Sequence, residues 1–539
     1  MGGGNVAVGA TWRSVRGVNF PGSERLSDRA GYGSHFHTHG LGAPITMRFL
    51  KFKLPVWVAG GLLTSVAATA TAAEPNVAGQ FDPDLYTQVA QADVPSVAVP
   101  VPAAPTLVPE DLYERRALPA AEAAEEAANE PNRYLQSRFL EERGIATYGW
   151  VDVGIGANNW GAPWNGPITF NDRAWQGMMN QLYLVNERTL GEDFDWGGRI
   201  DLLYGTDYIY TVAQGLDAFR SNPDPLGLSG PRWGSSRYYG LAMPQLYGEL
   251  GREDLGVKFG HFYTLIGYEV VPAIGNFFYT HAYTMQYGEP FTHTGILGNW
   301  TPNDQLNIVA GITNGWDNWD NGLLTGGPIA NTNYPGYNNN AAFLGAITFT
   351  SSDEKQALIL ANSSGNELGG VDALGGQLVG NRTVTSIVYT NELSDRLNYV
   401  YQSDIGYQFN AAPDYQTIGQ QDGTAYWYGV NQYMFYNFTD TLIGGLRLEW
   451  FRDNNGTRVL YGIRDGSPGL GGFAGNFWAM TWGLNYLMGS NFVIRPELRY
   501  DWFTPDAGGQ IANGGILPYG VNADKYGQFY GGCDIIWQF

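Results

Sequence analysis

The 539-residue sequence is short of cysteine, of charge and above all of basic residues. Its single Cys excludes a disulfide-stabilised scaffold and any zinc or iron–sulfur site built from cysteines. Charged residues make up 15% of the chain, against about 25% in an average globular protein. The sequence has 30 Lys and Arg but 51 Asp and Glu. The resulting net charge of −21 argues against nucleic-acid binding, which needs a basic surface.

Glycine and aromatic residues are abundant instead. The sequence has 74 Gly, 34 Tyr and 17 Trp, and 44% of its residues are hydrophobic, which is too many for a disordered chain. A charge-poor, glycine-rich and aromatic chain with a mean hydropathy of only −0.23 is unusual for a soluble enzyme and needs a structural explanation.

One short apolar stretch, residues 54–66, has the pattern of an export signal. Basic residues at 48–53 precede it and small residues follow it, so we predict a secretory signal peptide over residues 47–73. The alternative is a single membrane helix, which the Gly, Pro and Thr content disfavours. Because a signal peptide begins near the N-terminus, residues 1–46 are interpreted as a mis-assigned start or a disordered extension.

Residues 74–143 are rich in Ala, Pro and Val. Proline at this density disfavours both helix and sheet, so this segment is predicted to be an extended periplasmic linker with a short helix. No residue in it suggests chemistry.

From residue 144 to the end, the dominant period is two. In Leu446–Trp450, Leu and Trp alternate with Arg447 and Glu449, and Ile494–Trp502 repeats this pattern. Successive side chains of a strand point to opposite faces, so such strands have one apolar and one charged face. A soluble sandwich and a membrane barrel both fit this alternation.

The connections favour the barrel. Seven short polar turns are predicted at 191–194, 251–256, 299–305, 351–355, 392–396, 437–441 and 488–491. They alternate with eight long loops near 158–175, 208–241, 265–288, 314–340, 364–381, 410–424, 453–475 and 504–524. Fifteen connections join sixteen strands, and short turns on one side with long loops on the other are typical of outer-membrane barrels. We therefore predict an all-β, transmembrane antiparallel barrel of about sixteen strands over residues 144–539.

The C-terminal strand has an aromatic alternation of its own. Ile535, Trp537 and Phe539 share one face with Cys533, which would then face lipid or a neighbouring chain and is given no redox role. A terminal Phe that ends such a strand resembles the C-terminal insertion signal that the outer-membrane barrel-assembly machinery reads.

Several segments together resemble a known family. The segments are GIATYGWVDVGIGANNWG (144–161), GVKFGHFYTLIGYE (256–269), TNGWDNWDN (313–321) and the terminal Phe. Residues 144–539 resemble the beta-barrel porin-2 family of OmpL-like porins. This resemblance implies a passive outer-membrane porin and specifies no solute; residues 1–46 and the Pro-rich segment fall outside it.

Charged residues of the strands are predicted to line the lumen, because an Arg or Lys facing lipid at the bilayer midplane costs about 2–4 kcal/mol. The predicted pore-lining residues are Asp152, Glu187, Arg199, Asp201, Glu249, Lys258, Asp404, Arg447, Glu449, Arg495, Glu497, Arg499 and Asp501. They either create a mixed-charge field across a pore or neutralise one another along a solvated wall, and the sequence leaves both open.

The third long loop, which follows Tyr263, is unusually apolar. The third loop of general porins folds inward, and by analogy we expect this one to narrow the channel. Glu269 and Glu289 would then face Lys258, Arg495 and Arg499 across an eyelet. The alternative is that the loop caps the barrel mouth or packs on a neighbouring subunit.

Two further chemistries have little support. His261, His281 and His293 bracket the third loop, but His261 has the outward parity of Val257 and Phe259, which argues against a shared zinc site. A lipid-facing His261 keeps an outer-membrane hydrolase open, although no partner Ser is evident and a GxSxG motif is absent. The Trp316–Asn321 repeat departs from the EF-hand pattern and is interpreted as a structured outer loop rather than a calcium or sugar site.

The favoured hypothesis is therefore a non-enzymatic outer-membrane porin for small hydrophilic solutes. Its acidic balance predicts weak cation preference, and no cofactor or metal is expected. Expected partners are outer-membrane lipid, the barrel-assembly machinery and, by analogy with other sixteen-stranded porins, two further copies in a homotrimer. The alternatives are a barrel with a closed lumen that acts in adhesion or surface binding, and the hydrolase.

Overall fold

The computed structural model describes residues 135–161, 163–217, 233–234, 238–319, 341–371, 377–412, 423–462, 467–506 and 516–539. The predicted signal peptide, the segment before it and residues 74–134 of the predicted linker lie outside this part of the chain. In the described part, helices are short, and none is long and apolar enough to cross a membrane.

Sixteen strands dominate the described chain. They are β1 (Ala146–Asn158), β2 (Met178–Arg188), β3 (Asp195–Gly205), β4 (Gly240–Arg252), β5 (Leu255–Tyr263), β6 (Thr292–Asn303), β7 (Leu306–Thr313), β8 (Ala342–Thr350), β9 (Gln356–Val371), β10 (Gln377–Ser394), β11 (Leu397–Ala412), β12 (Gly423–Thr439), β13 (Leu442–Asp453), β14 (Gly475–Met488), β15 (Phe492–Pro505) and β16 (Gly527–Gln538). The short helical segments are α3 (Arg138–Glu141), α4 (Tyr208–Thr211), the 3₁₀ turn η2 (Ala273–Gly275) and the π-helical turn η3 (Thr284–Gly288).

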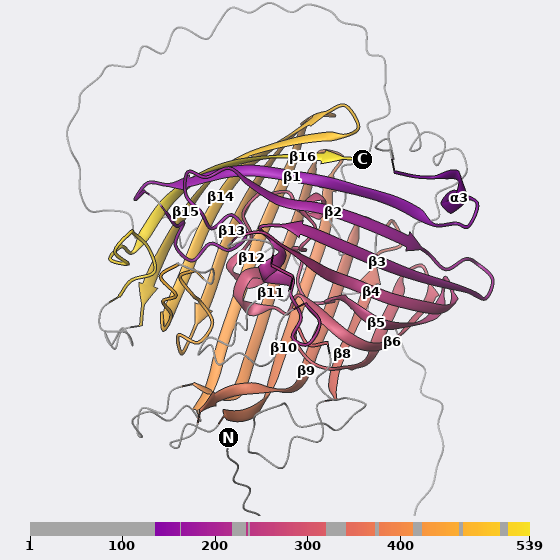
Figure 1. Cartoon of the computed structure of the whole chain (residues 1–539), viewed down its shortest axis with the longest axis horizontal. Helices are drawn as coiled ribbons and strands as arrows, with labels where there is room; N and C mark the ends of the chain where they lie inside the picture. The colour runs from indigo at the N-terminus through magenta and orange to yellow at the C-terminus, as the bar shows by residue number, and fades with distance from the viewer. Residues whose placement is uncertain are drawn as a thin grey trace, which may run out of the picture. The chain divides into compact units, whose positions relative to one another are not determined.

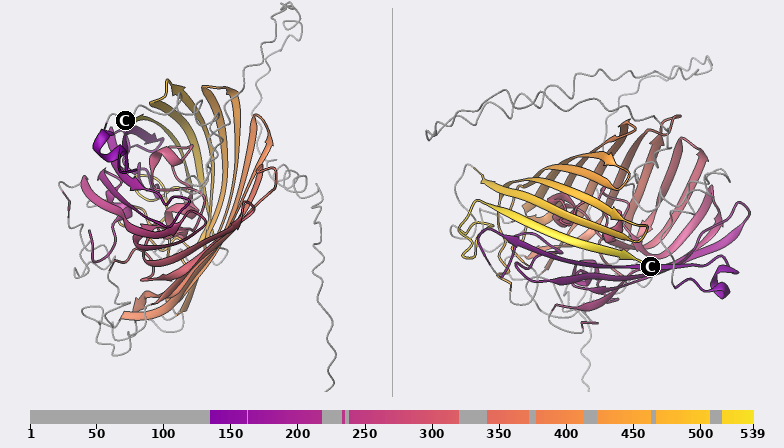
Figure 2. Two further views of the ribbon diagram at one scale, coloured as in Figure 1. Left: turned by 90° about the vertical axis from the view of Figure 1, so that its right-hand side faces the viewer. Right: turned by 90° about the horizontal axis from the view of Figure 1, so that it is seen from above.

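Each strand pairs antiparallel with the next, and β16 closes the sheet on β1. Figure 1 shows the last strand beside the first, and both views of Figure 2 show the strands tilted around a common interior. Closure leaves no strand edge with unpaired backbone groups, which is the condition for a sheet to span lipid. The predicted sixteen-stranded antiparallel barrel is confirmed.

All seven predicted short turns join paired strands. The connection between β4 and β5, for example, has only two residues. The predicted long loop at 364–381 is wrong, because β9 continues to Val371 and β10 begins at Gln377, with the two strands paired along this stretch. Its Gly and Asn residues predict a loop. Instead, its polar side chains bond across the outward face of the sheet: Asn381 donates to Ser364 at 3.3 Å, and Ser364 bonds Thr383 of β10.

The strands differ in length. β5, β7 and β8 have 8–9 residues, whereas β9 to β12 have 16–18, and about 9–11 tilted residues cross a bilayer. The wall is therefore higher along β9–β12, as the long orange strands of Figure 2 show.

The predicted alternation sets the two faces. On β15, Leu498 is 65% exposed outward while Arg499 is fully buried inward. Exposed aromatic residues lie near both ends of the strands: Phe194, Trp196, Trp300, Phe438, Phe492 and Trp537 near the short turns, and Trp160, Trp175, Phe409, Tyr426 and Tyr526 near the long loops. An apolar outer belt with an aromatic girdle at its border is the surface that a membrane barrel presents to lipid.

Candidate pore and its inward-folded loop

The thirteen predicted pore-lining residues all belong to strands of the barrel and lie on its inner face. Glu187, Glu249 and Lys258, near the short-turn end, keep partial contact with solvent. The other ten are buried: Asp152, Arg199, Asp201, Asp404, Arg447, Glu449, Arg495, Glu497, Arg499 and Asp501.

The connection between β5 and β6, residues 264–291 and called L3 below, accounts for much of this burial. It runs inside the barrel and includes η2 and η3, and almost all of its residues are buried. Phe277 and Phe278 pack with Ile359 of β9 and Phe435 of β12, so L3 reaches more than one side of the wall. The predicted apolar character of this loop is explained by this packing.

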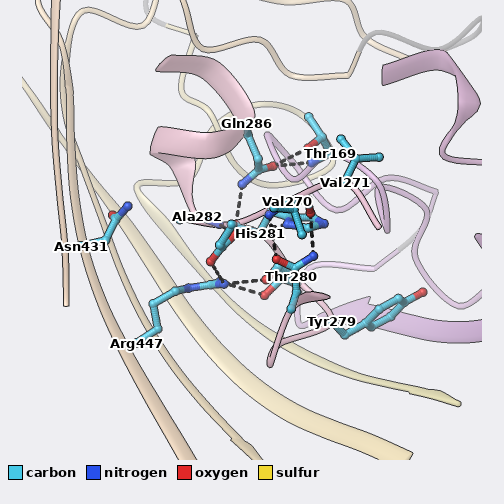
Figure 3. A network of polar contacts seen from close by, with 12 residues as sticks. Thr169, Val270, Val271, Tyr279, Thr280, His281, Ala282, Gln286, Asn431 and Arg447 are labelled. Carbon is cyan, nitrogen blue, oxygen red and sulfur yellow. Dashed lines mark hydrogen bonds and ion pairs between the residues drawn. The ribbon is translucent and has the colours of Figure 1, made fainter. Parts of the chain in front are cut away.

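Three inward arginines hold the backbone of L3. Arg447 donates to the carbonyl oxygen of Thr280 at 2.6 Å, Arg499 to that of His281 at 2.9 Å, and Arg495 to those of Ala273 and Asn276 at 2.9 and 2.6 Å. Figure 3 shows Arg447 reaching from β13 to this stretch of the loop. Loop carbonyls that would otherwise lose their hydrogen bonds on burial are satisfied in this way.

Neighbouring carboxylates of the wall also bind L3, by accepting hydrogen bonds from its backbone amides. Glu497 accepts from the backbone amide of Tyr279 at 3.0 Å, and Glu449 from that of Tyr283 at 2.9 Å. The Arg–Glu rows of β13 and β15 therefore bind the main chain of L3, in addition to pairing with one another.

Glu269 is the most connected acidic residue of L3. Its carboxylate accepts hydrogen bonds from Arg447 at 2.8 Å, from the amide of Ala282 at 2.8 Å and from Tyr433 at 3.1 Å, and it contacts His281 at 3.1 Å. Burial disfavours the charged form, but Arg447 and the hydrogen bonds outweigh it and lower the pKa of Glu269 to about 2.

Glu289, at the other end of L3, has the opposite environment. It accepts from Gln402 at 2.6 Å and interacts with the carboxyl group of Asp404. Burial and the negative charge of Asp404 raise the pKa of Glu289 well above its usual value. Gly267 lies against this carboxyl group at φ +91°, and a side chain at that position would overlap it. The first residues of L3, at Gly267, therefore contact its last residues, at Glu289, where the loop leaves and rejoins the wall.

The Glu289→Gln variant is expected to remove a pH dependence of stability. An acid whose pKa is raised by folding stabilises the fold fully below its unfolded pKa, about 4.3, and this stability declines as the pH rises toward the raised value. The variant should therefore resemble the wild type near pH 4 and exceed its stability at pH 8 by about 1–3 kcal/mol. Urea unfolding of the folded barrel at both pH values measures this.

Glu192→Gln, in the exposed β2–β3 turn, is the matched control and should change neither value. If Glu289→Gln lowered the stability equally at both pH values, the interpretation that Glu289 is protonated beside Asp404 would be contradicted.

The predicted eyelet pairs are arranged differently. Lys258 pairs with Glu249 at 3.6 Å, Arg495 with Asp534, and Arg499 with Asp501 at 2.7 Å and Glu449 at 3.1 Å. Glu269 and Glu289 instead face Arg447 and Asp404. Sequence spacing gives a side chain's face but not which strand of a closed barrel a loop will meet.

Several residues of this network were not singled out from the sequence. Gln181 of β2 bonds both the amide of Ala273 and the carbonyl of Val271, and Gln286 bridges Thr169 of the β1–β2 connection to His281 (Figure 3). Asp534 has the inward parity of the last strand, so the period-two pattern could have identified it. The neutral residues carry no comparable signal.

A family match decides what kind of barrel this is. The family model described as "Putative beta-barrel porin-2, OmpL-like" matches residues 144–539, the whole barrel. The chain belongs to this family. It is an outer-membrane porin-type barrel, and its family consists of channels rather than enzymes.

Solved porin structures are similar to this chain at low identity. DcaP of Acinetobacter baumannii is 13% identical, with 73% of this chain and 97% of that chain covered and a TM-score of 0.43. The anion-selective porin of Comamonas acidovorans (11%, 73% and 99%, 0.45) and the trimer form of OmpT of Vibrio cholerae (9%, 73% and 99%, 0.43) are further examples. No curated protein matches the chain.

The three histidines of the barrel region have different side-chain partners. His261 bonds Thr294, His281 contacts Glu269, and His293 bonds Thr264 and the carbonyl of Gly315. His261 was expected to face lipid, but it is fully buried with Trp319 edge-on to its ring. Within the described ranges, no group of three or more His, Cys, Asp or Glu residues is placed to hold a metal.

The Trp-rich repeat after β7 also has a structural role in the porin. Asp317 accepts from the backbone amides of Phe291 and Thr292, at 3.0 and 2.9 Å, and so fixes the end of L3 where it rejoins β6. Asp320 and Asn321 lie outside the described residues.

Proposed function

We propose that this porin mediates passive diffusion of small hydrophilic solutes across the outer membrane, with L3 narrowing the lumen. The observation that carries the proposal is the attachment of L3 to the inner wall by Arg447, Arg495 and Arg499. The side chains of a loop held at fixed points in a lumen set the width of a path beside it, and pore width and lining charge determine what diffuses.

Single-channel recording of the refolded full chain in a planar bilayer tests this proposal. Ohmic current steps are expected in potassium chloride. Correctly folded protein that gives no current would overturn the proposal.

Weak cation preference is assigned to the short-turn half of the lumen. There Glu187 and Glu249 keep solvent contact and outnumber Lys258, whereas most other lumen charges are buried in pairs. In a tenfold potassium chloride gradient, the reversal potential should have the sign of cation selectivity. The double change Glu187→Gln and Glu249→Gln should move it toward zero or to the opposite sign.

Glu192→Gln again serves as the control, because this acidic residue lies in an exposed turn outside the lumen. A wild-type reversal potential of anionic sign would contradict the assignment, and so would an unchanged value in the double variant.

The near-complete burial of L3 favours a second candidate, a closed barrel that acts through its outer surface in adhesion or binding. Absence of current together with binding of cells or surface polymers would favour this candidate.

The remaining partners follow from the surface. The apolar outer belt fits outer-membrane lipid, and Ile535, Trp537 and Phe539 fit a C-terminal insertion signal for the barrel-assembly machinery. A homotrimer is proposed by analogy with trimeric porins, and export through the signal peptide at residues 47–73 is proposed from the sequence.

A further inference from the structure

Two lumen arginines at the long-loop end differ from those that hold L3. Arg382 lies on the inner face of β10, near its start, and Arg458 lies in the connection after β13. Both are partly exposed. Among the described residues, no carboxylate oxygen lies within 4.0 Å of either guanidinium. They therefore lack the close acidic partners that Arg447, Arg495 and Arg499 have.

Aromatic rings and single hydrogen bonds hold these two guanidiniums in place. Arg382 lies over the ring of Trp316 at 4.8 Å, and Arg458 lies over Trp427 at 4.7 Å and Trp316 at 5.5 Å. The Nε of Arg382 donates to Gln408 at 2.8 Å, and that of Arg458 donates to the carbonyl of Tyr287 in L3 at 2.7 Å. Stacking on tryptophan orients a guanidinium without using its outer N–H groups.

The terminal nitrogens of both side chains remain available. In the described structure each of these arginines uses only its Nε as a side-chain donor. Both arginines contact the ring of Trp316, whose indole Nε1 is buried without an acceptor among the described residues. A negatively charged acceptor bound here would satisfy this buried indole donor and reduce the repulsion between the two like charges.

The surrounding charges do not replace such an acceptor. Asp453 is used by the backbone amides of Thr457, Arg458 and Val459, and Asp317 by those of Phe291 and Thr292. Glu367 accepts from the amide of Trp316. Asp453 and Asp317 attract Arg458, and Arg382 attracts Asp317 and Glu367. At Arg458, burial and the positive charge of Arg382 outweigh this attraction and lower the pKa to about 9.

We propose that Arg382, Arg458 and Trp316 form a binding site for a small oxyanion, a carboxylate or phosphate group of a solute that enters from the long-loop side. A planar guanidinium presents paired N–H donors that match two oxygens of such a group. The site lies directly beside L3, because Arg458 bonds Tyr287 and Trp427 donates to the carbonyl of Gly288 at 2.9 Å. That the bound solute is then transported rests on the proposed porin function; binding itself does not.

Calorimetric titration of the folded full chain with inorganic phosphate, at constant ionic strength, tests the site. Saturable binding is expected for the wild type. R382Q and R458Q should each weaken it about tenfold or more, because each removes charge-assisted hydrogen bonds. R452Q is the matched control: Arg452 is also near the long-loop end but pairs with Asp506 at 2.9 Å, and its loss should leave binding unchanged.

Three results would overturn the site: no saturable binding by the wild type, undiminished binding by R382Q, or an equal loss in R452Q. R382Q is informative if R458Q fails to fold, since Arg382 does not contact L3 by a hydrogen bond. Acetate in place of phosphate distinguishes a carboxylate site from a phosphate site.

Conductance separates this inference from the porin proposal. Phosphate added on the long-loop side should reduce potassium chloride current through the wild type and have less effect on R382Q. Phosphate binding without any current would support the binding site and contradict the porin function. Current without phosphate binding would support the porin function and contradict the binding site.

Discussion

Replacing Arg447 by glutamine is expected to release L3 from the wall and raise the single-channel conductance. Arg447 is fully buried and bonds Glu269, Glu449 and the Thr280 carbonyl at 2.6–2.8 Å. Removing one partner of a buried ion pair leaves the other charge uncompensated, at a cost of about 3–5 kcal/mol. That cost shifts the equilibrium between docked and released L3 by about a hundredfold or more.

The measurement is single-channel recording together with unfolding by urea. Larger and noisier current steps are expected, because a released loop samples several positions. Arg452→Gln on the same strand is the control, since Arg452 pairs with Asp506 away from L3. Unchanged conductance with unchanged stability would contradict the role of Arg447 in holding the loop.

Deleting Phe539 is expected to reduce the amount of folded barrel in the outer membrane severely. Phe539 exchanges two backbone hydrogen bonds of 2.9 Å with Gly149, so it extends the β16–β1 closure by one residue. Its ring is 9% exposed and lies 5.1 Å from that of Trp537. Loss of two hydrogen bonds and one buried aromatic ring removes about 3–5 kcal/mol of stability.

Two assays separate closure from recognition by the assembly machinery. Refolding into liposomes reports closure, and the amount of heat-modifiable barrel in cell envelopes reports assembly. A larger loss in cells than in liposomes is expected, with Phe539→Tyr close to the wild type in both. Normal levels of the deletion variant in cell envelopes would contradict the proposed signal.

The two acidic residues at the ends of L3 respond differently to pH. Glu269, whose pKa lies at about 2, keeps its charge across the physiological range, so its contact with Arg447 persists until strongly acidic pH. The Glu289 end of L3 responds in the opposite sense and is held better as the pH falls. An acid-induced change in conductance that Glu289→Gln removes would show that the contact of Glu289 with Gln402 and Asp404 of β11 influences the current.

The sequence determined the barrel and the face of each strand. Alternation in Leu446–Trp450 and Ile494–Trp502 is local information, and the short turns place neighbouring strands side by side, so membership of the sheet follows from spacing. The Gly- and Asn-rich stretch 364–381 shows the limit of this reasoning, because such residues are typical of loops and yet here belong in part to the long strands β9 and β10.

Only the tertiary structure decided which inward charge meets which. Glu269 and Arg447 are 178 residues apart, and their contact depends on the path of L3 through the closed barrel. The pairing of Arg382 and Arg458 with Trp316 likewise joins a strand and two separate connections. Period and spacing specify the direction of a side chain within its own strand, whereas the burial of L3 and the partners of its ends depend on closure of the whole wall around it.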